Sequence, residues 1–243
     1  MIKKFQNILK DIRKEVMKIY QEDFKVEYKE DNSPLTKADI YVHEKLKSFL
    51  TDYPILSEEE VIPYEIRKNW ETYWLIDPID GTKDFVERTG EFTVNIALIE
   101  KGIPIKGLIY VIAKDILYYG EKDNFSVRIE NYTENAETFL LPDKQTEILT
   151  FVTSRSHLNN KTKEFMYQYD KPFKTKSIGS SIKFCLVAEG SANIYPRFGP
   201  CMEWDSAAAH AILLGVGKNI YQENGEELKY NKKDLTNPNF IAR

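Results

Sequence analysis

The chain starts with hydrophobic residues spaced for one face of a helix. Apolar side chains recur every three or four positions, which predicts an amphipathic helix with a structural role. They are Phe5, Ile8, Leu9, Ile12, Val16, Ile19 and Tyr20. Alternation at Val26 and Tyr28 then predicts a short strand, which the Asp-Asn-Ser-Pro sequence of residues 31–34 closes with a turn.

A second helical stripe follows at Val42, Leu46, Phe49 and Leu50. It is preceded by Thr-Lys-Ala-Asp at residues 36–39, which has the form of a capping box. Asp39 lies three residues before Val42, on the buried stripe rather than the wet face. Two interpretations stay open: Asp39 caps the first turn, or its carboxylate points into a pocket built by later segments.

Residues 73–82 form the stretch around which the chain is organised, an apolar run that ends in Asp77, Pro78, Ile79, Asp80 and Gly81. This pattern predicts a buried strand that stops abruptly in a turn. Two carboxylates three residues apart can converge on a hard divalent cation. The alternative is an ordinary turn in which both side chains cap local backbone donors.

Further strands and helices divide the rest of the chain into two halves. Residues 93–99, 103–112 and 116–119 predict a largely antiparallel sheet because short turns separate them. The polar residues 130–145 predict a connection to a second half. There, strands alternate with helices, the pattern of an α/β fold. The predicted elements are strands at 149–153, 175–178 and 193–195 and helices ending near Tyr169 and Glu189.

Acidic residues also follow other predicted elements. Glu58, Glu59 and Glu60 come after the apolar pair Ile55 and Leu56. A charge run is typical of solvated surface, although this one repeats the strand-then-acid pattern of residues 73–82. Asp205 is in the first turn of a helix rich in small residues (207–211), where it either serves as an N-cap or is held rigidly as a metal ligand.

Composition narrows the class of protein. The chain has 243 residues, 42% of them hydrophobic, which suffices for a real core in one large or two modest domains. Its net charge of −4 predicts no general attraction to nucleic acid or anionic membranes. Two cysteines, Cys185 and Cys201, make a disulfide framework improbable and favour a reducing cytosol. No signal peptide or membrane span is visible, so we expect a cytoplasmic protein, with peripheral contact to the inner membrane left open.

Several chemistries lack their motifs. Neither the histidines nor the cysteines form a paired zinc pattern, and no dinucleotide fingerprint, phosphate loop or nucleophile elbow is present. An anion could instead meet the Gly-Ser-Ser sequence of residues 179–181, which lies at a strand-to-helix junction and offers backbone N–H groups and hydroxyls.

Three motifs together are specific to one superfamily. Ser57-Glu58-Glu59, residues 77–82 (Asp-Pro-Ile-Asp-Gly-Thr) and residues 204–208 (Trp-Asp-Ser-Ala-Ala) resemble the inositol monophosphatase superfamily of lithium-sensitive, magnesium-dependent phosphatases. Residues 31–34, 80–85, 90–99, 177–190 and 195–200 are similar to its CysQ branch of 3′(2′),5′-bisphosphate nucleotidases. The resemblance covers nearly the whole chain. It implies a layered αβαβα sandwich with an α+β half (1–145), an α/β half (146–243) and an active site between them.

The resemblance also implies a metal site. Glu58, Asp77, Asp80 and Asp205 fall on the superfamily's magnesium-ligand positions, with the backbone carbonyl of Ile79 as a further ligand. Two or three Mg²⁺ ions are expected. Two unit charges ~4 Å apart repel by about 4 kcal/mol at an effective dielectric of 20, so four converging carboxylates need cations. Two such ions can stabilise the attacking and leaving oxygens of an in-line displacement.

The implied reaction removes one phosphate from adenosine 3′,5′-bisphosphate and leaves AMP. Thr82, oriented by Asp39, aligns a metal-activated water with phosphorus, and Glu58 is the other candidate for directing its proton. The predicted substrate-binding residues are Gly81, Thr82, Gly179, Ser180, Ser181, Lys183, Arg197 and Asp205. Lys183 and Arg197 would meet the second phosphate or adenosine, the alternative being exposed, solvated charges.

Other functions remain open at this point. The runner-up enzyme is an inositol or fructose bisphosphate phosphatase with the same metals, and non-enzymatic alternatives are a nucleotide-binding sensor and a cation-binding structural module. The expected partner is a small nucleotide bisphosphate, not a nucleic acid. Monomer and homodimer are both compatible with the sequence, as is action on 3′-phosphoadenylyl sulfate.

Overall fold

The computed structural model describes residues 2–22, 26–28, 34–155 and 158–243. Within these ranges, seven strands form the main sheet in the order β3-β4-β5-β6-β7-β8-β9. β3 runs parallel to β4, and every other neighbouring pair is antiparallel. The strands are β3 (Ile55–Ser57), β4 (Thr72–Asp80), β5 (Thr93–Glu100), β6 (Ile103–Val111), β7 (Ile116–Glu121), β8 (Phe125–Glu130) and β9 (Glu137–Leu140). The predicted antiparallel sheet is therefore confirmed.

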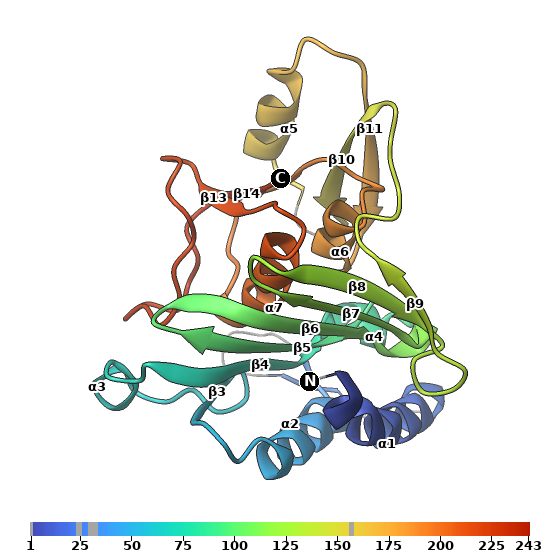
Figure 1. Ribbon diagram of the computed structural model, residues 1–243, viewed down its shortest axis with the longest axis vertical. Helices are drawn as coiled ribbons and strands as arrows, with labels where there is room; N and C mark the ends of the chain where they lie inside the picture. Colours follow the sequence, from blue (N-terminus) through green and yellow to red (C-terminus); the bar gives the residue numbers. More distant parts are fainter. Residues whose placement is uncertain (1, 23–25, 29–33, 156–157) are drawn as a thin grey trace.

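Two helices cover one face of this sheet, α1 (Ile2–Gln21) and α2 (Lys37–Phe49) (Figure 1). α1 buries Phe5, Leu9, Ile12 and Val16, so the predicted amphipathic helix is confirmed. The short pair β1 (Glu27–Tyr28) and β2 (Pro34–Leu35) precedes α2. Of the turn predicted at residues 31–34, residues 31–33 lie outside the described ranges.

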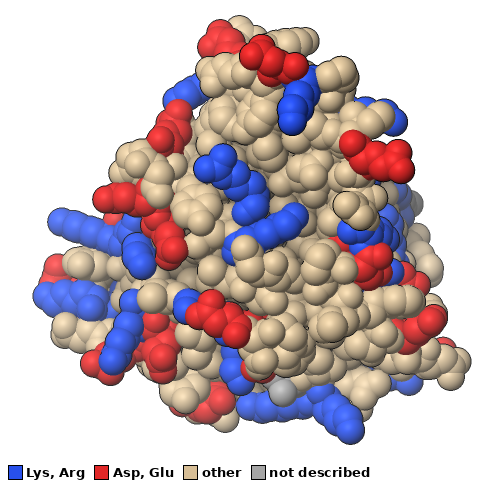
Figure 2. All heavy atoms as spheres, turned by 45° about the horizontal axis from the view of Figure 1, so that its top comes forward, with Lys and Arg blue, Asp and Glu red and all other residues tan. Residues whose placement is uncertain are grey.

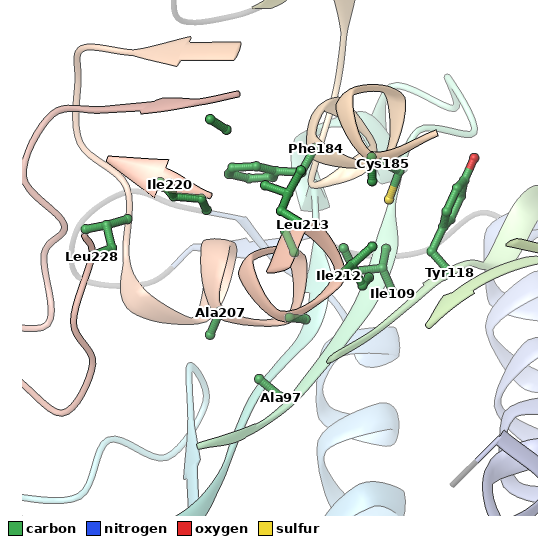
Figure 3. Packing of buried hydrophobic residues seen from close by; sticks show 14 of the residues in the cluster. Ala97, Ile109, Tyr118, Phe184, Cys185, Ala207, Ile212, Leu213, Ile220 and Leu228 are labelled. Carbon is green, nitrogen blue, oxygen red and sulfur yellow. The ribbon is translucent and has the colours of Figure 1, made fainter. Parts of the chain in front are cut away.

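The opposite face of the sheet packs against α7 (Glu203–Leu214), which crosses strands β4 to β8 (Figures 1 and 3). The predicted close packing of its alanines is confirmed, since Ala207, Ala208 and Ala209 are buried. A Cβ atom at Gly107 of β6 would lie 2.0 Å from the carbonyl oxygen of Ala208, a distance that no side chain tolerates. The sheet therefore holds α7 closely.

The remaining elements form the upper layers in Figure 1. β10 (Leu149–Ser154) and β11 (Phe173–Ile178) pair in parallel and are joined by α5 (Asn160–Tyr167). α6 (Ile182–Ala188) follows β11, and a three-stranded sheet has the order β12-β14-β13. Its strands are β12 (Tyr195–Arg197), β13 (Ile220–Gln222) and β14 (Phe240–Ala242). The layers from α1 and α2 up to α5 make an αβαβα sandwich, and the predicted strand–helix alternation is confirmed.

Two expectations about local structure are corrected. Residues 130–145 are not only a connection, because they contain the edge strand β9, whose mostly exposed side chains lack the alternation of a half-buried strand. The strand at residues 73–82 does not stop at Asp77 but continues as β4 to Asp80, with a shift in pairing to β5 between Asp77 and Asp80. Because pairing with β5 resumes at Asp80, the interruption at Pro78, which has no N–H to give the ladder, is a bulge-like irregularity within β4 and not the end of the strand.

Short elements complete the chain: α3 (Tyr64–Arg67), α4 (Thr82–Val86) and the 3-10 turn η1 (Ile112–Lys114). Among the described residues, no helix combines the length and apolar character that crossing a membrane requires. Basic and acidic side chains are intermingled on the face shown in Figure 2.

Candidate active site

Three aspartates from distant parts of the sequence converge beside the bulge in β4. Asp77 and Asp80 come from β4 and Asp205 from α7, and one carboxylate oxygen of each lies within 4.8 Å of the others. Glu58 follows β3, its backbone N–H donates to the carbonyl oxygen of Ile76 at 3.2 Å, and it lines the same pocket. The parallel pairing of β3 and β4 thus places both strand ends at one edge of the sheet.

The electrostatics of this cluster favour a cation. Burial, followed by the charges of Glu58, Asp80 and Asp205, raises the pKa of Asp77 well above its usual value. Burial, then Asp80 and Glu58, raises the pKa of Asp205 to about 7. Within the part of the chain that the structure describes, the buried Oδ1 of Asp77 has no hydrogen-bond partner. Carboxylate oxygens and one unpartnered buried acceptor are a donor set that fits a hard divalent cation.

Asp39 and Thr82 lie next to the cluster. Asp39 Oδ2 accepts hydrogen bonds from the N–H and hydroxyl of Thr36, at 2.8 and 2.6 Å, which confirms the capping box. Asp39 Oδ1 accepts a hydrogen bond from Thr82 Oγ1 at 3.2 Å, and the same hydroxyl lies 3.0 Å from the carbonyl oxygen of Ile79. Burial raises the pKa of Asp39 to about 6. The capping interpretation of Asp39 is therefore confirmed, and its second oxygen contacts Thr82, a pocket residue, although Asp39 does not itself line the pocket.

Asp205 caps its helix from a different position than the N-cap. The N-cap of α7 is Met202, and Asp205, the third helical residue, accepts a hydrogen bond from the Met202 N–H at Oδ2 (2.8 Å). The N-cap alternative is therefore wrong in position, because Asp205 reaches back from inside the helix.

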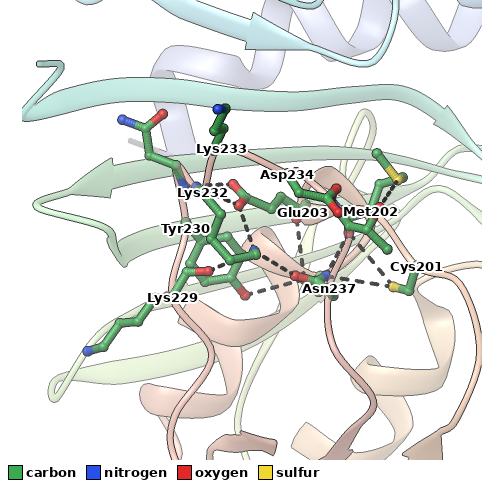
Figure 4. A network of polar contacts seen from close by, with 12 residues as sticks. Cys201, Met202, Glu203, Lys229, Tyr230, Lys232, Lys233, Asp234 and Asn237 are labelled. Carbon is green, nitrogen blue, oxygen red and sulfur yellow. Dashed lines mark hydrogen bonds and ion pairs between the residues drawn. The ribbon is translucent and has the colours of Figure 1, made fainter. Parts of the chain in front are cut away.

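The first turn of α7 is anchored by a buried polar network (Figure 4). Glu203 is fully buried and accepts hydrogen bonds from the backbone N–H groups of Asn231 and Lys232, at 2.7 and 2.9 Å. The Asn237 side-chain amide donates to Met202 O and Ser206 Oγ, both at 2.8 Å. Asp205 is thus held on a rigid support.

A pocket of about 250 Å³ opens over the carboxylates. The predicted substrate-binding residues all line it: Gly81, Thr82, Gly179, Ser180, Ser181, Lys183, Arg197 and Asp205. The backbone N–H of Ser181 donates to Asp80 Oδ2, and the 179–181 turn precedes α6 rather than forming its first turn.

The two predicted phosphate-binding cations differ in exposure. Lys183 is buried, and its ammonium lies 5.6 Å from the centre of the Tyr195 ring. Burial lowers its pKa. The alternative of an exposed, solvated charge is therefore wrong for Lys183. Arg197 is partly buried, and its Nε has no hydrogen-bond partner among the described residues.

The whole chain matches a known family. The family model described as "Inositol monophosphatase family" matches residues 2–242. The chain belongs to the inositol monophosphatase family. The predicted family and fold class are both confirmed by this match and by the structural comparisons below.

Relatives within the family share most of their length with this chain. It is 42% identical over 237 residues to 3′(2′),5′-bisphosphate nucleotidase CysQ of Salmonella typhimurium, covering 93% of this chain and 92% of that protein. The Escherichia coli K12 protein of the same name is 41% identical over the same shares. The crystal structure of CysQ from Bacteroides thetaiotaomicron superposes with a TM-score of 0.88 at 38% identity, covering 99% and 96% of the two chains. The Thermotoga maritima IMPase, at 21% identity, 98% and 89% coverage and a TM-score of 0.73, shares the fold.

Seven residues that line the pocket were not predicted as site residues from the sequence: Lys83, Asp84, Ser154, Arg155, Phe184, Tyr195 and Cys201. Arg155 carried a usable signal, because it comes directly after β10. The parallel partner of β10, β11, ends at Ile178, directly before the predicted site residue Gly179. Neighbouring parallel strands deliver the residues after them to the same edge.

Proposed function

We propose that this chain is a metal-dependent 3′(2′),5′-bisphosphate nucleotidase that hydrolyses adenosine 3′,5′-bisphosphate to AMP and phosphate. The observation that carries the proposal is the identity of about two fifths, over nine tenths of the chain, to proteins named as CysQ nucleotidases. The converging carboxylates supply the chemistry that such an activity needs.

The residues that would hold Mg²⁺ are Glu58, Asp77, Asp80 and Asp205, with the carbonyl oxygen of Ile79. Two or three ions would balance these charges. When bound, they neutralise charge on the phosphate and lower the pKa of a coordinated water. The raised pKa values of Asp77 and Asp205 support this assignment, because only mutual repulsion and burial raise them and a cation relieves both.

Thr82 and Asp39 would orient the attacking water. The Thr82 hydroxyl has one proton, and donating it in a hydrogen bond to Asp39 Oδ1 leaves the oxygen lone pairs free to accept a hydrogen bond from the attacking water. Asp39 acts through Thr82 and holds that hydroxyl in one orientation. Glu58, which lines the same pocket, is the alternative acceptor for the water proton.

The opposite wall would bind the rest of the nucleotide. Lys183 and Arg197 supply positive charge for the second phosphate, and residues 179–181 with Gly81 supply backbone and hydroxyl groups. Because Lys183 is buried, its charge acts in a region of low dielectric, where an ion pair with phosphate is stronger than at the surface.

A phosphate-release panel tests the proposal. Adenosine 3′,5′-bisphosphate, 3′-phosphoadenylyl sulfate, inositol 1-phosphate and fructose 1,6-bisphosphate are compared with Mg²⁺, with a chelator and with Mg²⁺ plus Li⁺. We expect the highest kcat/KM for adenosine 3′,5′-bisphosphate, loss of activity in chelator and inhibition by Li⁺. A preference for either sugar phosphate would move the assignment to another branch of the family, and absence of turnover would favour a nucleotide sensor.

A further inference from the structure

Three charged residues outside the carboxylate cluster meet at the pocket, and we call them the Arg155 cluster. Arg155 Nη1 lies 2.9 Å from Asp84 Oδ1, and its Nη2 lies 2.7 Å from Glu91 Oε2. Asp84 belongs to α4, Glu91 precedes β5, and Arg155 follows β10. One guanidinium therefore joins two carboxylates more than sixty residues away in the sequence.

The Arg155 cluster is built against the backbone of Gly179. Glu91 Oε2, the oxygen that faces Arg155, also accepts the Gly179 N–H at 2.6 Å. A Cβ atom at Gly179 would lie 2.5 Å from Asp84 Oδ2, so the backbone touches the second carboxylate as well. The two acids thus contact the first residue of the 179–181 turn and hold it in place.

That turn reaches the carboxylate cluster directly. The Ser181 N–H donates to Asp80 Oδ2, and Ser181 Oγ donates to Asn95 Oδ1 at 2.8 Å. Ser180 has a positive φ of 47°, a conformation that a non-glycine residue keeps only where its surroundings hold it. The position of residues 179–181 therefore depends on Asp84 and Glu91.

Two carboxylates beside a phosphate-binding pocket would repel an anionic ligand. Asp84 is almost fully buried and Glu91 largely so, and both are near a pocket that would take a doubly phosphorylated ligand. Like charges repel more strongly where water is excluded. Arg155 offsets this repulsion because it contacts both acids while its side chain, 38% exposed, itself lines the pocket.

We propose that Arg155 is a positioning residue for substrate binding: its charge offsets one of the two negative charges of Asp84 and Glu91, so that these acids hold the 179–181 turn with less repulsion of an anionic ligand. The inference rests on the proposed function for the nature of that ligand. It assigns Arg155 to ground-state binding rather than to the chemical step, because Arg155 pairs with Asp84 and Glu91, the acids that contact Gly179, and not with Asp39, Thr82 or Glu58.

Charge-rescue kinetics test this role. Arg155→Met leaves two uncompensated acids, and we expect the KM for adenosine 3′,5′-bisphosphate to rise about tenfold while kcat changes by less than about threefold. Adding Glu91→Gln restores the original cluster charge and keeps a carbonyl oxygen for the Gly179 N–H, so most of the KM should return. The increase in KM should shrink at high salt, which screens charge but does not repair packing.

Two further variants complete the design. Arg155→Lys keeps the charge and should stay within about threefold of the wild-type KM, which gives a result even if Arg155→Met does not fold. Lys161 lies on α5, outside the pocket, and pairs with Glu223. Lys161→Met removes this cation and should change neither kcat nor KM. An unrescued double variant, a tenfold rise in KM for Arg155→Lys, or equal losses in kcat and kcat/KM would overturn the proposal.

A binding measurement separates failure of this inference from failure of the proposed function. The Kd of AMP in the presence of Mg²⁺, measured by calorimetry without turnover, should follow the same order of variants as the KM. If the wild-type protein releases no phosphate, the nucleotidase assignment fails. Adenosine 3′,5′-bisphosphate then serves as the calorimetric ligand, and its Kd in the Arg155 variants tests the positioning role of Arg155. An unchanged Kd in Arg155→Met would reject the role of Arg155 alone.

Discussion

Asp77 and Glu189 are equally buried carboxylates with opposite surroundings, each about 1% exposed. Glu189, at the end of α6, accepts hydrogen bonds from Tyr118 and Arg128 at one oxygen, at 2.9 and 3.0 Å, and from Lys144 at the other, at 2.9 Å. Asp77 faces other carboxylates, and its Oδ1 has no hydrogen-bond partner within the described ranges.

The two environments shift the acids in opposite directions. Burial alone would raise the pKa of Glu189, but hydrogen bonds from Ser191 and Lys144 lower it overall. Burial and like charges raise the pKa of Asp77. Burial alone therefore does not distinguish a structural acid from a functional one. The distinguishing feature is whether the protein itself supplies the opposite charge, which it does for Glu189 and which the described residues do not do for Asp77.

Of the substitutions at these two acids, Asp77→Asn should have the largest effect on activity. Removing the charge takes away a proposed metal ligand, so we expect kcat/KM for phosphate release to fall by at least about 10³-fold. In chelator, the same variant should be no less stable than wild type, because it removes repulsion in a buried acidic cluster. Thermal unfolding with and without Mg²⁺ measures the second effect.

Asp123→Asn is the matched control, since Asp123 is an exposed aspartate in the turn between β7 and β8. It should leave both activity and stability unchanged. A fully active Asp77→Asn protein would support the structural-module alternative.

Glu189→Gln should show the reverse pattern, a loss of stability without a loss of chemistry. The variant leaves the buried Arg128 without one of its carboxylate partners, and breaking buried pairs costs about 3 kcal/mol or more. We expect an unfolding free energy lower by roughly that amount in denaturant titration and a kcat/KM within about threefold of wild type. Arg128 also contacts Asp143 at 2.9 Å, so a much smaller loss would mean that this second acid takes over.

The fold could be predicted from the sequence wherever one face of an element is buried. Phe5, Leu9 and Ile12 mark the inner face of α1 because their spacing follows the helical period. The strand β9 gives no such signal, since it pairs on one side only and leaves its side chains exposed. The bulge after Asp77 is equally invisible, because the same residues serve a turn or a bulge and only the pairing with β5 decides.

The carboxylates of the candidate site were predictable from their motifs, whereas the environments of the surrounding pocket residues were less predictable. The structure places Asp77, Asp80 and Asp205 together as expected, although their role as ligands stays a prediction. The burial of Lys183 depends on Tyr195 and on the packing of distant elements, which local pattern does not encode. The pairing of Arg155 with Asp84 spans 71 positions and has no sequence signal beyond the strand end before Arg155.

Removing a hydroxyl group beside each carboxylate extends the comparison between the two acid environments with smaller expected effects. Thr82 and Tyr118 each donate a hydrogen bond to a buried carboxylate, Asp39 and Glu189 respectively. Thr82→Val should lower kcat by about 10²-fold, the lower end of the range for proton-transfer groups, while Thr82→Ser keeps most activity. Tyr118→Phe should instead cost about 1 kcal/mol of stability and leave kcat unchanged. Steady-state kinetics and denaturant unfolding of the three variants measure these effects. Equal losses of kcat at Thr82 and Tyr118 would contradict the assignment of a catalytic role to Thr82 and a structural role to Tyr118.

The smallest expected effect is a pH dependence of the metal-free protein. Burial raises the pKa of Asp39 to about 6 and that of Asp205 to about 7, against 3.8 for an ordinary aspartate, so the folded chain binds more protons than the unfolded chain above pH 4. Stability from these groups is present at low pH and falls as pH rises through 6 to 7.

The measurement window has a lower limit set by His210. Burial lowers the pKa of His210 to about 4, so below pH 6.5 the unfolded chain takes up its proton first and stability falls for that reason. In chelator we therefore expect unfolding free energy to be lower at pH 8 than at pH 6.5 by roughly 1 kcal/mol, about the value of one pKa unit. Asp77→Asn should weaken this slope, Mg²⁺ should abolish it, and Glu189→Gln should leave it unchanged, because Glu189 is already ionised throughout the window. A slope of the opposite sign would mean that the acids of the cluster do not repel one another in the folded protein.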